Sequence, residues 1–302
     1  MIEAIELPET AENRYAMLGC LALRGQLRNQ IDSFETLWKE FLEQPLEVSG
    51  LRLLRIHLRM LRSTVKVLEP LLPFAGKEWL GILKAAADNL GTIREYDVAL
   101  RDCDKYSLYI GQEPVALKEL LSAKRKEKTE AWLEMVEPEK IAEVVAGLSE
   151  LLQNPRPLFL EEEALANAFL QARLQNWGMK LCNKLQNEVE KDDMEKLHAV
   201  RIKVKRFRYA YSAYMNGEAD QELLMCLKNA QDTLGSIHDG SCNLAIMENL
   251  VAVAPNEQLA AEFTSFRAWR TEKLRQSLDR LPEVCTELVA SLHRNIEGAR
   301  LL

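Results

Sequence analysis

Two segments of the chain share one pattern: RLLRIHLRMLRSTVKVL at residues 52–68 and HAVRIKVKRFRYAYSAY at residues 198–214. They align at an offset of 146 residues, with basic and apolar side chains at matching places. A second pair, DNLGTIREYD from Asp88 and DTLGSIHDGS from Asp232, aligns at an offset of 144. Because the two matches come in the same order at nearly the same offset, they predict an internal duplication.

The basic residues of each segment fall on one side of a helix. At about 100° per residue, spacings of three and four keep them within an arc of roughly 80°. An apolar stripe runs directly beside this arc, from Leu54 to Leu68 in the first segment and from Val200 to Tyr214 in the second. A helix packed by its apolar stripe therefore holds its cations at the margin of the core, pointing into a groove. These two basic stripes consist of Arg52, Arg55, Arg59, Arg62 and Lys66, and of His198, Arg201, Lys205 and Arg208.

The charge of these stripes favours an anion as the partner. Like charges three and four apart each destabilise a helix by about 0.2–0.5 kcal/mol, so the four such pairs of the first stripe cost about 1–2 kcal/mol. A solvated basic face, the alternative, would be expected to intersperse Glu. Stacked Arg and Lys side chains instead present a ladder of donors to a phosphate chain. His198 is either a phosphate ligand, tunable in charge near neutral pH, or a hydrogen-bonded groove residue, and we favour the ligand.

The charge of the whole chain is distributed unevenly. The 302 residues carry 39 Lys and Arg against 46 Asp and Glu, a net charge of −7. Residues 50–68 carry +5 and residues 196–217 carry +6, so the remainder carries −18. An acidic body with two concentrated basic segments indicates an anionic partner rather than general affinity for nucleic acid.

The chain is predicted to be all-α. Gly (13) and Pro (10) are scarce, and apolar residues recur at spacings of three and four. Ser49 is expected to cap one helix at its N-terminus, and Gly91 and Gly235 are expected to end helices as C-caps. The segment QNPRPLFL at 153–160 is the expected linker. The helices are predicted at about 18–41, 49–69, 77–90, 94–110, 114–136, 139–152, 161–190, 193–215, 219–236, 239–251, 256–280 and 282–297.

Other motifs are weak, and we predict no cofactor, no metal and no catalytic residues. The chain has no GxxxxGK[ST], HExxH or CxxC pattern. The dipeptide His238-Asp239 could suggest a metal phosphohydrolase, but with four histidines in the chain no second ligand cluster is evident. Arg94 could reach a bound anion, cap a helix or form an ion pair. The run KRKEK at 124–128 points its cations all round a helix and is interpreted as a solvated face.

The remaining features indicate a cytoplasmic protein that does not enter a membrane. No apolar run approaches the roughly 20 residues of a membrane helix, and no export signal is visible. The six cysteines are scattered without pairing motifs, so they are expected to be free thiols in a reduced compartment.

The stripe of the second segment resembles the signature of the CHAD family, the conserved histidine α-helical domain, roughly H-x-x-R-V-x-x-R-R-x-R. Its positions are occupied by His198, Arg201, Lys205, Arg206 and Arg208. In the first segment Arg55, Arg59 and Arg62 fit, whereas Arg52 stands in place of the histidine and Met60 replaces the second residue of the basic pair. LGSIHD at 234–239 resembles the family's weaker second signature, and LGTIREYDV at 90–98 matches it with Glu95 in place of Asp.

The resemblance implies a single CHAD domain over residues 1–302. It would consist of two duplicated antiparallel four-helix bundles, at about 11–152 and 161–302, related by a pseudo-two-fold with a basic groove or channel between them. The family is associated with binding inorganic polyphosphate, and some members are fused to a CYTH triphosphatase domain. Because this chain has no ExExK strand motif, it resembles a stand-alone binder.

The function we predict is non-catalytic binding of inorganic polyphosphate by the basic stripes and Arg206, with Arg94 and Lys203 as possible additional contacts. Nucleic acid is the alternative ligand, weakened by the −18 of the remainder and by the lack of aromatic residues among the first stripe's cations. A phosphohydrolase would need metal-binding carboxylates or a nucleophile, which no motif supplies. A scaffold that recruits partners to polyphosphate-rich bodies is compatible with the leading prediction.

Overall fold

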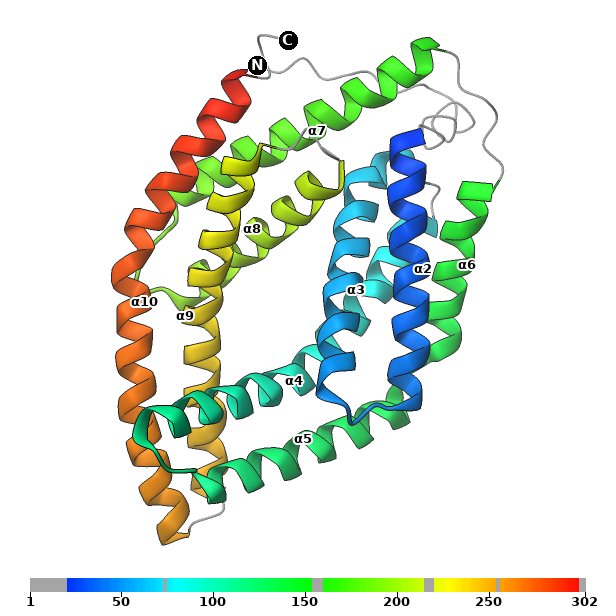
Figure 1. Cartoon of the computed structure of the whole chain (residues 1–302). Helices are drawn as coiled ribbons and strands as arrows, with labels where there is room; N and C mark the ends of the chain where they lie inside the picture. The colour runs from blue at the N-terminus through cyan, green and yellow to red at the C-terminus, as the bar shows by residue number, and fades with distance from the viewer. Residues whose placement is uncertain (1–20, 73–74, 154–159, 215–219, 254–255, 299–302) are drawn as a thin grey trace.

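The prediction of an all-α protein is confirmed for the residues that the computed structural model describes, which are 21–72, 75–153, 160–214, 220–253 and 256–298. Nine α-helices and a 3₁₀ turn, η1 (Glu69–Leu71), make up these ranges (Figure 1). None of these helices is both long and apolar enough to cross a membrane. The α-helices are α2 (Leu21–Glu43), α3 (Val48–Leu68), α4 (Ala75–Ile110), α5 (Val115–Met135), α6 (Pro138–Gln153), α7 (Leu160–Asn187), α8 (Met194–Tyr214), α9 (Gln221–Val253) and α10 (Glu257–Gly298).

Three long helices replace six that the sequence predicted. The C-cap prediction is wrong for both glycines, because α4 continues through Gly91 and α9 through Gly235. A glycine inside a helix lowers its stability by about 1 kcal/mol and does not by itself end it. Leu90 and Ile93 are fully buried on either side of Gly91, and this apolar packing carries the helix past the glycine. Likewise α10 continues through Pro282.

Two smaller predictions are also wrong. Ser49 does not cap α3, since the helix begins at Val48 and the N-cap position belongs to Glu47. Within the run KRKEK, Lys126 and Lys128 are exposed as expected, but Arg125 is only 6% exposed. Its Nε lies 2.6 Å from a carboxylate oxygen of Asp97 on α4, so this cation ties α5 to α4.

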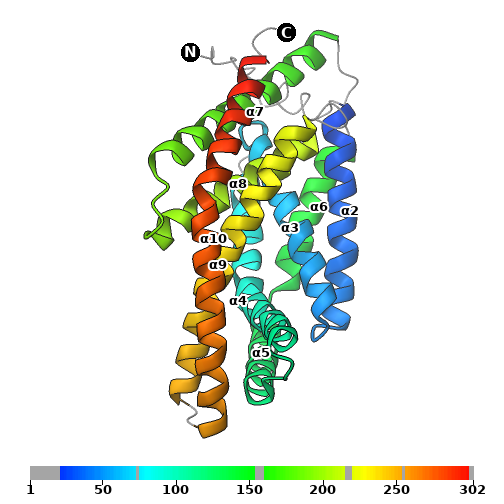
Figure 2. The ribbon, with the colours of Figure 1, turned by 60° about the vertical axis from the view of Figure 1, so that its left-hand side comes forward.

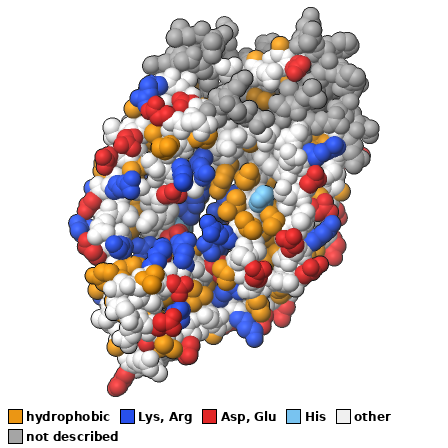
Figure 3. All heavy atoms as spheres, viewed as in Figure 1, with side chains coloured by type: hydrophobic (Ala, Val, Ile, Leu, Met, Phe, Trp, Pro, Cys, Tyr) orange, Lys and Arg blue, Asp and Glu red, His pale blue; other side chains and the backbone are white. Residues whose placement is uncertain are grey.

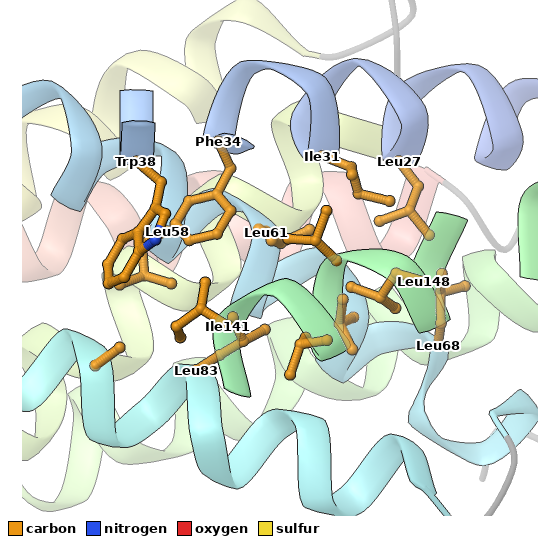
Figure 4. Packing of buried hydrophobic residues seen from close by; sticks show 14 of the residues in the cluster. Leu27, Ile31, Phe34, Trp38, Leu58, Leu61, Leu68, Leu83, Ile141 and Leu148 are labelled. Atoms are coloured by element: carbon orange, nitrogen blue, oxygen red, sulfur yellow. The ribbon is translucent and has the colours of Figure 1, made fainter. Parts of the chain in front are cut away.

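The apolar side chains form three core clusters. The first lies between α2, α3, α6 and the first half of α4, where residues such as Phe34, Leu58 and Leu83 point toward one another (Figure 4). The second lies between α7, α8, α9 and α10. The third joins the end of α4 and the start of α5 to α9 and α10, which run side by side in Figures 1 and 2. The two halves of the chain are therefore joined by a core of their own.

The duplicated segments occupy α3 and α8, and the second matching pair occupies α4 and α9. In the structure α3 packs against α8, and α4 packs against α9. A two-fold relation requires equivalent elements at the axis to meet in this way. The duplication into two bundles stays a prediction, which this pairing supports. The start of the predicted first repeat and residues 154–159 of the predicted linker lie outside the described residues.

Replacing Gly235 by alanine should stabilise the protein. A Cβ at this position meets no atom within 4 Å, and alanine favours a helix interior by about 0.5–1 kcal/mol. Gly111, which follows α4, has a φ of +73°, so Gly111→Ala should destabilise by about 1 kcal/mol. Urea unfolding of both variants measures the two changes. A loss of stability in Gly235→Ala would restore the C-cap interpretation.

Candidate anion-binding site

The packing of α3 on α8 brings the two basic stripes together. Burial, followed by the positive charges of Arg59 and Arg94, lowers the pKa of Arg55. Burial, followed by the charges of Arg201 and Arg59, lowers the pKa of Lys205 to about 6. Cations from α3, α4 and α8 therefore lie close enough for their charges to add to the effect of burial on Arg55 and Lys205. We call Arg55, Arg59, Arg94, Arg201 and Lys205 the central cluster.

Most of this cluster has no acidic partner. Within the described part of the chain, Arg55, Arg59, Arg201 and Lys205 form no ion pair with any acidic side chain. The Nε of Arg201 is buried without a hydrogen-bond partner, and Arg55 reaches only the carbonyl oxygen of Ala87, at 3.5 Å. Buried cations are ordinarily paired, because removal from water costs several kcal/mol per ion. An unpaired cluster of this kind is suited to an anion from outside the chain.

Arg94 is the exception. Its guanidinium lies 3.4 Å from Asp97, the same carboxylate that Arg125 holds at 2.6 Å. The sequence left open whether Arg94 contacts an anion or forms an ion pair. The ion pair is present, and Arg94 still lies close enough to act on Arg55.

Two carboxylates lie in the field of the cluster. Glu95 on α4 and Asp239 on α9 occupy equivalent places in the two repeats. Burial first, and then the charge of Asp239, raises the pKa of Glu95, while Arg55 and Arg201 oppose this shift. Asp239 is held by Arg101, with 3.4 Å between Oδ2 and the guanidinium. Neither carboxylate pairs directly with a cation of the basic stripes within the described residues.

A pair of histidines borders the cluster. Nδ1 of His198 on α8 lies 3.1 Å from Nδ1 of His238 on α9, so one ring donates to the other. Burial, followed by the charge of Arg201, lowers the pKa of His238 to about 3, and burial also lowers the pKa of His198. Both rings are therefore neutral at neutral pH. A cavity of about 30 Å³ lies beside them.

The same neighbourhood contains Cys242, whose Sγ lies 3.6 Å from Nε2 of His238. Burial raises the pKa of this thiol to about 11, so it stays protonated. Across the described ranges, no group of three or more His, Cys, Asp or Glu side chains is arranged to hold a metal ion.

The other predicted site residues lie around the cluster or away from it. Burial first, and to a smaller extent the charges of Arg206 and Arg59, lower the pKa of the partly buried Arg62, whereas Arg206 is exposed. Arg52 is exposed. Lys66, in the last turn of α3, forms an ion pair with Glu69, the C-cap residue of that helix.

The remaining two lie on α8. Arg208 donates to Gln231 at 2.9 Å and covers the ring of Tyr209. Lys203 is exposed, and its charge acts on Lys184 of α7 rather than on the cluster. The structure therefore does not bring Lys203 to the site.

Three residues of this neighbourhood escaped the sequence prediction: His238, Glu95 and Asp239. The sequence considered His238 only as a metal ligand. The offset of 144 residues pairs His238 with Arg94 and Asp239 with Glu95, so the duplication itself held the missing signal. Gly91 lies beside this neighbourhood, since a Cβ there would lie 3.4 Å from the guanidinium of Arg55.

A second set of buried polar contacts fixes α4, α9 and α10 around the site. Asp102 accepts a hydrogen bond from Asn243 at 2.8 Å and lies 3.0 Å from Nε of Arg270. Arg270 crosses α9 at Gly240, where a Cβ would lie 3.0 Å from the guanidinium carbon.

The surface view shows Lys and Arg side chains gathered in the middle of one face, around a hollow between α8 and α3 (Figure 3).

The fold thus defines an all-helical protein organised around two basic helices that pack on each other. The chain belongs to the CHAD domain family, whose model matches residues 25–248. No match was found among curated proteins.

Two solved structures are similar in fold. The crystal structure of the CHAD domain from the plant Ricinus communis has a TM-score of 0.66 and 20% identity, covering 89% of this chain and 91% of that chain. PptA from Streptomyces chartreusis has a TM-score of 0.64 and 16% identity, covering 87% of this chain and 97% of that chain. At these identities the likeness shows the fold alone.

Replacing Lys205 by methionine should stabilise the empty protein, most strongly at acidic pH. The pKa of Lys205 is about 6 in the folded protein, below its value in the unfolded chain. Its positive charge therefore lowers the free energy of unfolding in full below pH 6, and this effect fades as the pH rises and is gone above about pH 10. We expect Lys205→Met to exceed the wild type by about 1–2 kcal/mol at pH 6, allowing for the partial exposure of the side chain, and by less at pH 9. Urea unfolding at both pH values measures this. Lys203→Met, on the exposed side of the same helix, is the control and should show no such trend.

Proposed function

We propose that this protein binds inorganic polyphosphate without hydrolysing it. The observation that carries the proposal is that the buried Arg55 and the partly buried Arg201 and Lys205, from two packed helices, form no ion pair within the described residues. In the proposed complex the phosphate chain runs along a basic groove between α3 and α8. Its non-bridging oxygens accept hydrogen bonds from the central cluster and from the flanking Arg62 and Arg206.

The chemistry of the side chains suits such a ligand. Arginine presents a planar fork that can bind two oxygens at once, and lysine presents a compact charge. A polyphosphate chain repeats its negative charge at every phosphate, so it can satisfy cations that are stacked turn upon turn. Membership of the CHAD domain family, with which polyphosphate binding is associated, supports the same ligand.

The setting we propose is the reduced cytoplasm. Cys103, Cys182, Cys226, Cys242 and Cys285 are free thiols. A protein that binds polyphosphate without consuming it could also recruit partners to polyphosphate-rich bodies, and this role is part of the proposal.

A competition experiment tests the ligand. Long-chain polyphosphate and single-stranded RNA should be compared at matched phosphate concentration and fixed salt. We expect polyphosphate to bind at least tenfold more tightly, because its charges are closer together along the chain. The logarithm of the affinity should fall linearly with that of the salt concentration, with a slope of roughly 0.7 for each of about five or more contacts.

Two results would contradict the proposal. Preferential binding of RNA would favour a nucleic-acid-binding protein. Steady release of orthophosphate in the presence of Mg²⁺ or Mn²⁺, abolished by substitution of a stripe residue, would indicate a phosphohydrolase.

Charge reversal inside the cluster tests the site. Arg59→Glu or Lys205→Glu removes one contact and adds a repulsion, and each should weaken polyphosphate binding by about 2–4 kcal/mol, or roughly 30- to 1000-fold. The control is Lys124→Glu combined with Lys128→Glu, which shifts the net charge twice as far and leaves the buried Arg125 in place. It should stay within a few-fold of the wild type. Equal losses in all three, each shown to be folded by circular dichroism, would mean that attraction is generic.

A further inference from the structure

Two arginines share the carboxylate of Asp97 on α4. Nε of Arg125, from α5, lies 2.6 Å from Oδ1, and a terminal nitrogen of the Arg94 guanidinium lies 3.4 Å from Oδ2. A hydrogen bond between a cation and a carboxylate is normally about 2.7–2.9 Å long. Asp97 is therefore bound firmly by Arg125 and only loosely by Arg94.

The two arginines also differ in their surroundings. Arg125 is buried, and its guanidinium donates a second hydrogen bond, of 2.7 Å, to the carbonyl oxygen of Leu46 in the turn between α2 and α3. The side chain of Arg94 is 17% exposed, and among the described residues it has no hydrogen bond or ion pair other than the contact with Asp97. Arg94 can therefore leave Asp97 at the loss of one weak contact, whereas Arg125 is fixed by two strong ones.

Arg94 lies on the face of α4 that meets the central cluster. The guanidinium of Arg55 lies 3.5 Å from the carbonyl oxygen of Ala87 and 3.4 Å from the place of a Cβ at Gly91. Ala87, Gly91 and Arg94 follow one another at spacings of four and three, so they share one face of the helix. An anion that binds Arg55 thus meets a second guanidinium from α4.

We propose that Arg94 exchanges Asp97 for a phosphate oxygen when the anion binds, and that Arg125 is the positioning residue that allows this exchange. The inference rests on the proposed function. The side chain of Asp97 is 0% exposed, and a buried carboxylate without a partner is strongly unfavourable. Because Arg125 stays on Oδ1, Asp97 remains paired after Arg94 has turned to the ligand.

The second repeat has a different pair of residues at these places. At the offset of 144 residues, Arg94 corresponds to His238 and Asp97 to Ser241. The carboxylate is thus present in the repeat that carries an arginine and absent from the repeat that carries a histidine. This difference fits a role for Asp97 in holding Arg94 while the site is empty.

Polyphosphate affinities of single and double variants test the exchange. Arg94→Met removes one contact, so affinity should fall by about three- to tenfold, and the salt slope should fall by about 0.7. Arg125→Met leaves Arg94 as the partner of Asp97 and keeps it there, so the same two losses are expected. In the double variant the losses should match those of Arg94→Met within about twofold, because one contact is lost only once. Lys126→Met removes an exposed cation of α5 and should stay within about twofold of the wild type.

A rescue variant separates the exchange from damage to the fold. Arg125→Met should be less stable, since Asp97 keeps only its loose partner. Asp97→Asn combined with Arg125→Met removes both charges of the buried pair and leaves Arg94 without an internal partner. This variant should bind polyphosphate at least as tightly as the wild type, and adding Arg94→Met to it should cost at least threefold. Circular dichroism checks that each variant is folded.

Three results would overturn the exchange while leaving polyphosphate binding intact. They are wild-type affinity in Arg94→Met, additive losses in the Arg94→Met and Arg125→Met double variant, and a loss in Asp97→Asn with Arg125→Met as large as in Arg94→Met. Absence of polyphosphate binding by the wild type at every salt concentration would instead overturn the proposed function.

Discussion

The cost of holding cations together at the packed faces of α3 and α8, out of water and beside one another, is what the rest of the fold must offset. Burial first, and then the neighbouring positive charges, lower the pKa values of Arg55 and Lys205. The opposing force comes from the apolar stripes beside them. Leu54, Leu58 and Val204 are completely buried, and each such side chain contributes roughly 1.5–3 kcal/mol. Apolar packing therefore holds together charges that would otherwise separate, which leaves their donors free.

The sequence predicted that these cations lie at the margin of the core, because this placement depends on periodicity, whereas the meeting of the two helices came from the family resemblance. Two stripes that lie side by side on one helix must place cations at the edge of the core, whatever the partner helix is. The unpredicted features depend on contacts between distant residues. Arg125 looked solvated because its partner, Asp97, lies 28 residues away and on another helix. Gly91 was predicted to be a C-cap because the local sequence does not show the buried packing of Leu90 and Ile93 that carries α4 past it.

The two repeats differ where their equivalent residues would touch. His198 and His238 are neutral and can meet at 3.1 Å. Their counterparts in the first repeat, Arg52 and Arg94, are both permanent cations and cannot share a proton in this way. Accordingly Arg52 is exposed, and Arg94 turns to Asp97. The departure of the first repeat from the histidine signature thus has a structural counterpart: the second repeat places a hydrogen-bonded pair of histidines where the first repeat has two arginines that stay apart.

The carboxylates of Glu95 and Asp239 complete this balance. A cluster with no acid nearby would place the whole repulsion on the packing of α3 and α8, whereas a cluster paired one to one would have no donor left for a ligand. Glu95 and Asp239 lie between these extremes, because they act on Arg55 and Arg201 through space without pairing with them. Asp239 lies on α9, and its carboxylate is positioned by the ion pair with Arg101 of α4. The donors stay available, and the same carboxylates that stabilise the empty cluster would repel a bound polyanion. In the proposed complex, affinity is therefore limited by the groups that allow the site to exist unfilled.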